Sequence, residues 1–169
     1  MRAVILVLVA WGLGGCASIP EGSGVEYDPL ESTNRTLFGF NEAIDKVTLK
    51  PIARGYKKIT PEPIRNGVTN FSRNLATPGS SINNFLQGKP GDGMQELARF
   101  VINSTFGIAG IIDVATFGGI EAHREDFGQT AAVWGAPAGP YVVLPFLGPR
   151  TMRETLMLPL DILADPLWH

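Results

Sequence analysis

The sequence contains one cysteine and two histidines, and both counts limit its chemistry. Cys16 has no partner for an internal disulfide, and His123 and His169 form no pair at the spacing of metal ligands. No G-x-S-x-G motif presents a nucleophilic serine, and no glycine-rich phosphate loop ends in a lysine. These absences predict a protein without metal or other cofactor that binds or conducts something, and not an enzyme.

Charge is also scarce. Charged residues make up 18% of the chain, against about 25% in ordinary soluble domains. The net charge of −2 excludes the basic footprint of a nucleic-acid-binding protein. Because 44% of the residues are hydrophobic, we expect part of the surface to contact lipid or protein instead of water.

The chain lacks a hydrophobic run long enough for a transmembrane helix. Its longest such run, Ala3–Leu13, follows the positive charge of Arg2 and has the length of a signal-peptide core, whereas a membrane span needs about 20 residues. Residues 1–15 are therefore predicted to be a signal peptide.

The lone cysteine directly follows this segment. It allows three interpretations: a redox or catalytic thiol, half of an intermolecular disulfide, or a site of covalent modification. The sequence Leu13-Gly14-Gly15-Cys16 resembles a bacterial lipobox, in which the thiol receives a diacylglyceryl group and cleavage leaves an acylated first residue. The alternative is an ordinary signal peptide with an incidental cysteine. We favour lipidation of Cys16, with covalent diacylglycerol and N-acyl (palmitate-type) chains.

The residues after the cysteine indicate a destination. Lipoproteins retained at the inner membrane have aspartate at the next position, where this chain has Ala17 and Ser18. We therefore expect a lipid anchor in the periplasmic leaflet of the outer membrane of a Gram-negative bacterium. Residues 16–27 are predicted to form the lipidated N-terminus and a tether, and residues 28–169 a single domain.

Helix start signals recur through the first part of this domain. Apolar residues at helical spacing follow each signal and predict short amphipathic helices. The expected boundaries are Asp28 to Pro51, an amphipathic turn over 52–59, a helix opened by Thr60-Pro61, a third segment begun by Thr77-Pro78, and a helix from Asp92 or Gly93 to about Thr105. The apolar stripes fit equally well the core-facing sides of an ordinary helical bundle.

The next segment, FGIAGIIDVATFGGI over residues 106–120, is apolar on nearly all sides. Asp113 and Thr116 are its only polar side chains, and the segment is too short for a clean membrane span. It predicts a buried or membrane-dipping helical hairpin, with Asp113 capping a second arm or facing a polar cavity. The alternative is a buried core helix with a glycine-rich neck.

The last part of the chain alternates short elements with breaks. Asp126 is predicted to cap a helix that extends to Trp134, and Tyr141–Leu144 has the composition of an extended segment. Pro149 is suited to the first turn of a last helix, which Pro159 is expected to kink or divide.

Two polar patterns in the chain are not interpreted as functional sites. The acidic residues around His123 and Arg124 are interpreted as a solvated loop and helix cap: Glu121, Glu125 and Asp126. Beside a bacterial lipobox, three N-x-S/T sequences are interpreted as chance: those at Asn34, Asn70 and Asn103.

Several longer motifs occur in a fixed order and together resemble the VacJ/MlaA family of outer-membrane phospholipid-handling lipoproteins. The resemblance extends from about Tyr27 to Pro166, nearly the whole mature chain. The motifs are YDPLESTNR, NFSRNL, NFLQGKP, RFVINSTFGIAGIIDVA, EDFGQT, WG and GPYVVLPFLGP. The chain departs from the family where Arg153-Glu154 and Met157 replace the usual Arg-Asp and Gly. Family members also continue for several tens of residues beyond His169, so the domain is expected to lack their C-terminal part.

The resemblance implies a mainly α-helical fold, a single domain of short amphipathic helices arranged as a ring in the plane of the membrane. It also implies an amphipathic channel, trimeric porins that hold the ring in place, and a periplasmic lipid-carrier protein that receives phospholipids misplaced in the outer leaflet. The effect is to maintain lipid asymmetry. A lipoprotein that only scaffolds porins or other envelope proteins is the alternative.

The apolar, glycine-rich segment over 106–120 is the predicted flank or gate of this channel. Six of its residues are the candidates for contact with lipid: Phe106, Ile108, Ile111, Ile112, Asp113 and Phe117.

Overall fold

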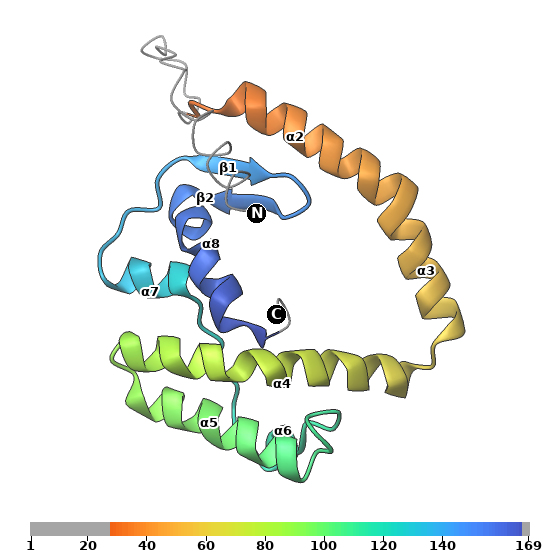
Figure 1. The fold of residues 1–169 in the computed structure, drawn as a ribbon, viewed down its shortest axis with the longest axis vertical. Helices are drawn as coiled ribbons and strands as arrows, with labels where there is room; N and C mark the ends of the chain where they lie inside the picture. Colours follow the sequence, from red (N-terminus) through yellow and green to blue (C-terminus); the bar gives the residue numbers. More distant parts are fainter. Residues whose placement is uncertain (1–27, 167–169) are drawn as a thin grey trace.

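The computed structural model describes residues 28–166 and has a mainly helical fold with one small sheet (Figure 1), as predicted. The elements are α2 (Glu31–Ile44), η1 (Asp45–Leu49), α3 (Lys50–Ile59), α4 (Glu62–Leu86), α5 (Pro90–Thr105), α6 (Val114–Phe117), α7 (Phe127–Val133), β1 (Tyr141–Leu144), β2 (Gly148–Thr151) and α8 (Met152–Ala164). The signal peptide, the lipobox and the tether lie outside the described residues.

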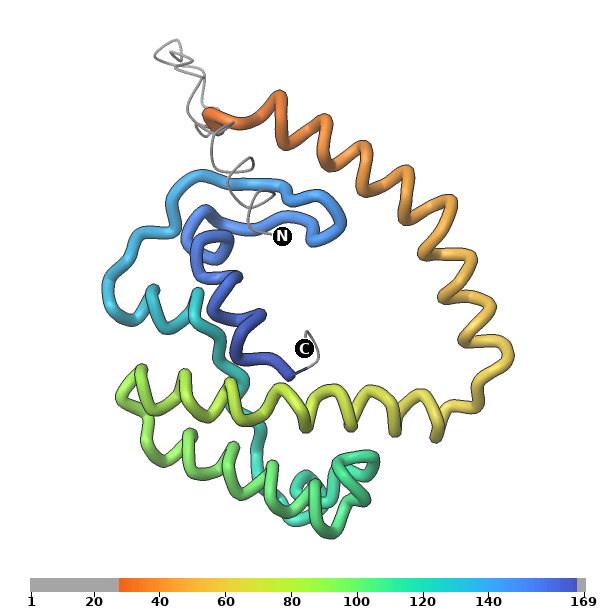
Figure 2. The backbone as a smooth tube through the Cα atoms, viewed as in Figure 1, coloured from red at the N-terminus to blue at the C-terminus, as the bar shows by residue number. Residues whose placement is uncertain are grey.

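These elements follow a closed circuit. Figure 2 shows α2, η1 and α3 as one curved arm that leads into α4, with α8 and the β hairpin completing the other side. The strand β1 contacts α2, and α8 contacts both the hairpin and α4, so packing closes the circuit. The ring arrangement is confirmed, whereas its orientation relative to a membrane stays a prediction. In the described part of the chain, no helix is long and apolar enough to cross a membrane.

The prediction that Pro51 ends the first helix is wrong. A π-helical turn, η1, precedes this proline, and the Lys50 N–H donates to the Asp45 carbonyl five residues back. Pro51 therefore lies in the first turn of α3, where its missing N–H costs little. The wider π turn gives the proline ring the room that it would lack in a regular helix, and the arm continues to Ile59.

The prediction of a new helix at Thr77-Pro78 is also wrong, because Pro78 lies inside α4. An internal proline costs about 3 kcal/mol in an isolated helix. Here α4 packs against α5, α7 and α8, and this packing overrides the local preference. The expected division of the last helix at Pro159 does not occur either, since α8 continues through it.

The β hairpin changes the predicted start of the last helix. The expected extended segment Tyr141–Leu144 is confirmed as β1, and it pairs antiparallel with β2, Tyr141 opposite Thr151. Pro149 lies in β2 and not in the last helix. The helix α8 begins instead after Thr151, whose hydroxyl accepts from the Glu154 N–H while the Glu154 carboxylate accepts from the Thr151 N–H.

The segment over 106–120 is not the predicted helical hairpin. It is a tight loop followed by the four-residue helix α6, with positive φ angles at Ile108, Ala109 and Gly110. The predicted capping role of Asp113 is confirmed, because its side chain accepts from the Thr116 N–H. The predicted cap at Asp126 is confirmed in the same way, with the Gln129 N–H 2.7 Å from its carboxylate.

Candidate functional site

The distribution of apolar and polar side chains is inverted in the described residues. Only Ala115, Ala131 and Val143 form a buried apolar core, whereas 29 large hydrophobic side chains are exposed. The buried polar and charged residues are instead numerous: Asn34, Asn74, Ser81, Asn83, Asn84, Glu96, Arg99, Asn103 and Thr130. A water-soluble domain buries its apolar residues, so this surface fits an apolar environment.

The exposed apolar side chains occur along the whole ring. On α3, Ile52 and Ile59 are 65% and 80% exposed, and on α8, Leu156 and Leu163 are 65% and 67% exposed. Exposed apolar side chains in this number mark contact with protein or lipid in a folded chain.

The interior is held by polar side chains that bond to backbone groups and to other side chains. Between α4 and α5, the Ser81 hydroxyl donates to the Gly93 carbonyl at 2.8 Å. The Asn84 amide donates to the His123 carbonyl at 2.7 Å, and the Asn74 amide donates to the Ser104 hydroxyl at 2.9 Å. Directional bonds of this kind replace apolar packing as the force that fixes these helices.

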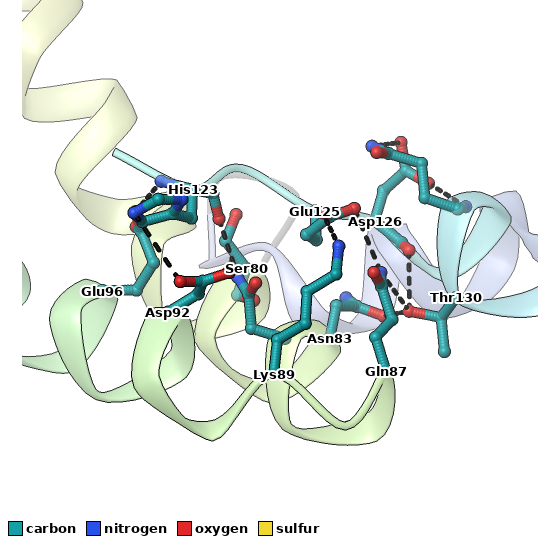
Figure 3. A network of polar contacts seen from close by, with 12 residues as sticks. Ser80, Asn83, Gln87, Lys89, Asp92, Glu96, His123, Glu125, Asp126 and Thr130 are labelled. Carbon is teal, nitrogen blue, oxygen red and sulfur yellow. Dashed lines mark hydrogen bonds and ion pairs between the residues drawn. The ribbon is translucent and has the colours of Figure 1, made fainter. Parts of the chain in front are cut away.

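Figure 3 shows how the segment before α7 is fixed to the turn between α4 and α5. The Glu125 carboxylate accepts from Lys89 at 2.8 Å and from the Gln87 amide at 3.0 Å. The Thr130 hydroxyl donates to the Asn83 side chain at 2.7 Å. The side chain of Glu125 is only 15% exposed, so this carboxylate belongs to a structural network and not to the solvated loop that its sequence pattern predicts.

A second polar cluster holds the loop over 106–112 and α6. The Arg99 guanidinium donates to the Asp113 carboxylate at 2.9 and 3.0 Å, to the Thr116 hydroxyl, and to the Ile120 carbonyl. Asn103 donates to Asp113 at 2.9 Å and accepts from the Ala115 N–H at 2.8 Å. Partial burial raises the pKa of Asp113, but the bonds from Thr116 and Asn103 and the Arg99 charge outweigh it and lower that pKa overall.

The predicted gate residues all come from this segment. The structure presents the five apolar ones outward, whereas Asp113 is bonded inward to Arg99 and Asn103. Phe106, Ile108 and Phe117 are 76%, 65% and 84% exposed, and Ile111 and Ile112 are also exposed. Of the two expected locations, buried or dipping into a membrane, the buried one is therefore wrong and the other stays a prediction. The loop packs through its backbone against α4, on the side away from α8 in Figure 1. Its gating role stays a prediction.

Gly110 shows how closely the loop backbone approaches α4. Its φ is +91°, and a Cβ atom there would lie 2.5 Å from the Asn74 Cβ. Gly110→Ala should therefore lower the free energy of unfolding by at least about 2 kcal/mol. Gly55→Ala on α3 is the matched control: nothing lies within 4 Å of the new methyl group, and a gain of about 0.5 to 1 kcal/mol is expected. Denaturant unfolding of the detergent-solubilised protein measures both, and equal effects would contradict the close packing.

Two side chains missed by the sequence reasoning close the ring. Asn34 donates to the Tyr141 carbonyl at 2.9 Å and accepts from the Val143 N–H at 2.8 Å. Asn41, seven residues further along α2, donates to the Leu144 carbonyl at 2.9 Å and accepts from the Phe146 N–H at 2.8 Å. The available signal is two asparagines at heptad spacing among apolar residues.

Two cavities lie beside α4. One, of about 300 Å³, lies between α4, α8 and the hairpin turn. It combines the apolar Leu147, Leu158 and Ile162 with Arg150 and four acidic residues: Glu125, Asp126, Asp161 and Asp165. The other, of about 240 Å³, lies between α4, α5 and the segment before α7, and most of the residues that line it have polar or charged side chains. Within residues 28–166, no three His, Cys, Asp or Glu side chains are grouped as metal ligands would be. The first cavity matches an amphipathic ligand better than a purely polar one.

Cys16, the predicted lipidation site, precedes the described residues, so its modification stays a prediction.

Comparison with known proteins gives consistent matches. A family model described as "MlaA lipoprotein" matches residues 26–169. The intermembrane phospholipid transport system lipoprotein MlaA of Escherichia coli is 39% identical over 158 residues, covering 91% of this chain and 63% of the relative. The protein of the same name from Haemophilus influenzae is 37% identical over 154 residues, covering 88% of this chain and 61% of the relative. The chain thus spans less than two thirds of the length of these curated relatives.

A solved structure also matches. It comes from work on the structural basis for maintenance of bacterial outer membrane lipid asymmetry, and it superposes with a TM-score of 0.70 at 38% sequence identity. The match covers 80% of this chain and 74% of that structure.

Proposed function

Because the chain belongs to the MlaA lipoprotein family, we propose that it removes phospholipids misplaced in the outer leaflet of the outer membrane and passes them to a periplasmic lipid carrier. Outer-membrane lipid asymmetry is maintained as a result. In this proposal the chain binds and conducts lipid, uses no cofactor and catalyses no reaction.

The inverted distribution of side chains carries this proposal. Large apolar residues are exposed along α3, the loop over 106–112 and α8, while amides and guanidinium groups are buried. In a membrane leaflet, the exposed apolar residues lie among acyl chains, where they are stable without a covering domain. No helix of the described chain need cross the bilayer for this arrangement.

The energetics of lipid movement require a conduit of this kind. Drawing a two-chain phospholipid through water exposes on the order of 28 methylenes at about 0.8 kcal/mol each, or roughly 20 kcal/mol. A protein that conducts the lipid must offer the tails an apolar path and the headgroup a polar one. The cavity between α4 and α8 supports this requirement, because Leu158 and Ile162 lie beside Arg150 and Asp161.

The proposal includes the anchor and the partners. The acylated Cys16 holds the N-terminus in the periplasmic leaflet, and trimeric porins hold the ring in place beside it. A domain held at the membrane by its acyl chains alone would need no apolar surface of its own. The exposed apolar residues therefore favour a ring embedded in the leaflet over one only attached to it.

The test is lipid transfer from vesicles containing the full chain to a purified periplasmic carrier, followed with a fluorescent phospholipid. The expected result is protein-dependent transfer of unmodified lipid, with mass spectrometry showing no hydrolysis products. Ile162→Asp, which places a charge in the cavity between α4 and α8, should slow transfer at least tenfold.

Ile162→Leu is the matched control, because it keeps the side chain apolar at the same position, and it should transfer at the original rate. No transfer by the unaltered protein would favour the scaffold alternative. Unchanged transfer by Ile162→Asp would show that lipids do not pass this cavity.

A further inference from the structure

The helix α3 is the least supported element of the ring. Its side chains from Lys50 to Ile59 are exposed, and among the described elements it packs mainly on η1, its own continuation. The helix nevertheless has a marked pattern: four basic residues and no acidic residue occur over Lys50–Ile59. A helix with two distinct free faces points to a partner outside the described chain.

The two faces of α3 are separated around the helix axis. At 100° per residue, the apolar side chains gather on one side: Ile52, Tyr56 and Ile59. The basic side chains gather on the other: Lys50, Arg54, Lys57 and Lys58. This pattern, apolar on one side and basic on the other, is typical of helices that lie in the interface of a membrane.

Charge pairing differs along the arm. Lys46 pairs with Glu42 and Lys50 pairs with Asp45, both at 2.8 Å. In contrast, Arg54, Lys57 and Lys58 have no carboxylate partner within residues 28–166. Three neighbouring cations are therefore available for an anion that the chain itself does not supply.

The end of α3 needs no further partner. Arg65 donates to the Lys57 carbonyl at 2.9 Å and to the Thr60 carbonyl at 3.3 Å, which satisfies acceptors at the helix C-terminus. Favourable interaction with the helix dipole accounts for Lys57 and Lys58 in the last turn. It accounts neither for Arg54, one turn earlier, nor for the exposed apolar face.

We propose that α3 lies along the lipid interface, with Arg54, Lys57 and Lys58 binding the phosphates of anionic phospholipids, so that the ring prefers anionic to zwitterionic neighbours. The apolar face enters the acyl region, and the long basic side chains extend to the phosphates. This inference rests on the proposed membrane location and adds the charge class of the lipid.

The test is the association of spin-labelled lipids with the full chain reconstituted in phosphatidylcholine bilayers. A basic residue contributes a factor of about five to the binding of an anionic group, and one lipid headgroup is expected to contact one of these side chains at a time. The motionally restricted lipid should therefore be enriched in phosphatidylglycerol over phosphatidylcholine. Arg54→Gln/Lys57→Gln/Lys58→Gln should lower that enrichment by up to about fivefold, since glutamine retains helix propensity without charge. Salt at 1 M should lower it similarly in the unaltered protein.

The matched control removes three positive charges from exposed side chains elsewhere, Arg35→Gln/Arg73→Gln/Arg124→Gln, and should keep the enrichment. Equal enrichment in the α3 variant and the unaltered protein would overturn the inference. So would a photoreactive residue at Ile59 that crosslinks to protein and not to lipid in native membranes. If α3-dependent selectivity is found but the unaltered protein transfers no lipid, the proposed function fails and this inference stands.

Discussion

Replacing Asp113 with leucine is expected to lower the free energy of unfolding by about 3 to 5 kcal/mol. The Arg99 side chain is only 8% exposed, and Asp113 is its one carboxylate partner in the described chain. The substitution leaves a buried guanidinium without an opposite charge, although its bonds to Thr116 and Ile120 remain, and this costs more than the pair contributes when intact. Denaturant unfolding of the detergent-solubilised protein, followed by circular dichroism, measures the loss.

Two further variants separate the lost charge from the lost shape. Asp113→Asn retains hydrogen-bonding atoms and should cost less than the leucine variant. The double variant Arg99→Met/Asp113→Leu removes the uncompensated charge and should recover part of the stability. A double variant no more stable than Asp113→Leu would contradict the role assigned to the ion pair.

The same site predicts a dependence on pH. The pKa of Asp113 lies below its ordinary value of 3.8 because the bonds from Thr116 and Asn103 and the Arg99 charge outweigh partial burial. Its stabilisation is therefore present above that ordinary value and is lost as the pH falls through the lowered pKa. Asp161, whose pKa burial raises, contributes with the opposite sign. The difference between the unaltered protein and Asp113→Asn isolates the first effect.

The sequence predicted best those features that depend on a few neighbouring residues. Asp113 and Asp126 cap helices as expected, because an aspartate three residues before an available N–H needs no distant partner. The extended segment Tyr141–Leu144 was recognisable from its own composition. Local chemistry is sufficient in each of these cases.

The prolines show where local chemistry is insufficient. Pro51 and Pro78 were expected to end or begin helices, yet the arm passes the first through a π turn and α4 passes the second without interruption. A proline's cost in a helix is a few kcal/mol, and packing across a 25-residue helix can exceed it. That packing is made mostly by the next helix, α5, and in part by α7 and α8, which come 40 or more residues later, so the residues around the proline do not reveal it.

The direction in which each amphipathic face points was likewise not predictable from spacing. The stripe that includes Ile64, Val68 and Phe71 fits a buried core or a lipid-facing surface equally well, since the period is the same in both. The structure exposes all three side chains and buries Asn74 and Asn84 on the same helix. The residues that organise the interior are therefore polar. Except for Asp113, none of them can be recognised from the spacing of apolar residues.

Opening the ring by replacing the asparagines that close it is expected to lower both the stability and the rate of lipid transfer. Asn34→Leu removes an amide that is 5% exposed and leaves the buried Val143 N–H and the Tyr141 carbonyl without their partner. The expected loss is about 2 to 3 kcal/mol, because unpaired buried groups cost about 1 to 3 kcal/mol each and relaxation recovers part of it. Adding Asn41→Leu frees the hairpin turn as well, and lipid transfer should then fall at least tenfold.

Spin labels at Phe38 on α2 and Pro145 in the hairpin turn measure closure directly, since both side chains are exposed. The unaltered ring should give a narrow distance distribution and the double asparagine variant a broad one. Asn66→Leu is the matched control: this asparagine is exposed on α4 and has no side-chain partner in the described chain, so its loss should change stability by less than about 0.5 kcal/mol. If the double variant kept both the narrow distribution and the original transfer rate, the asparagines would not hold the ring closed. An opened ring no longer offers the tails a continuous apolar path, so transfer is expected to fall. A broad distribution with unchanged transfer would contradict that expectation and show that lipid conduction does not need a closed ring.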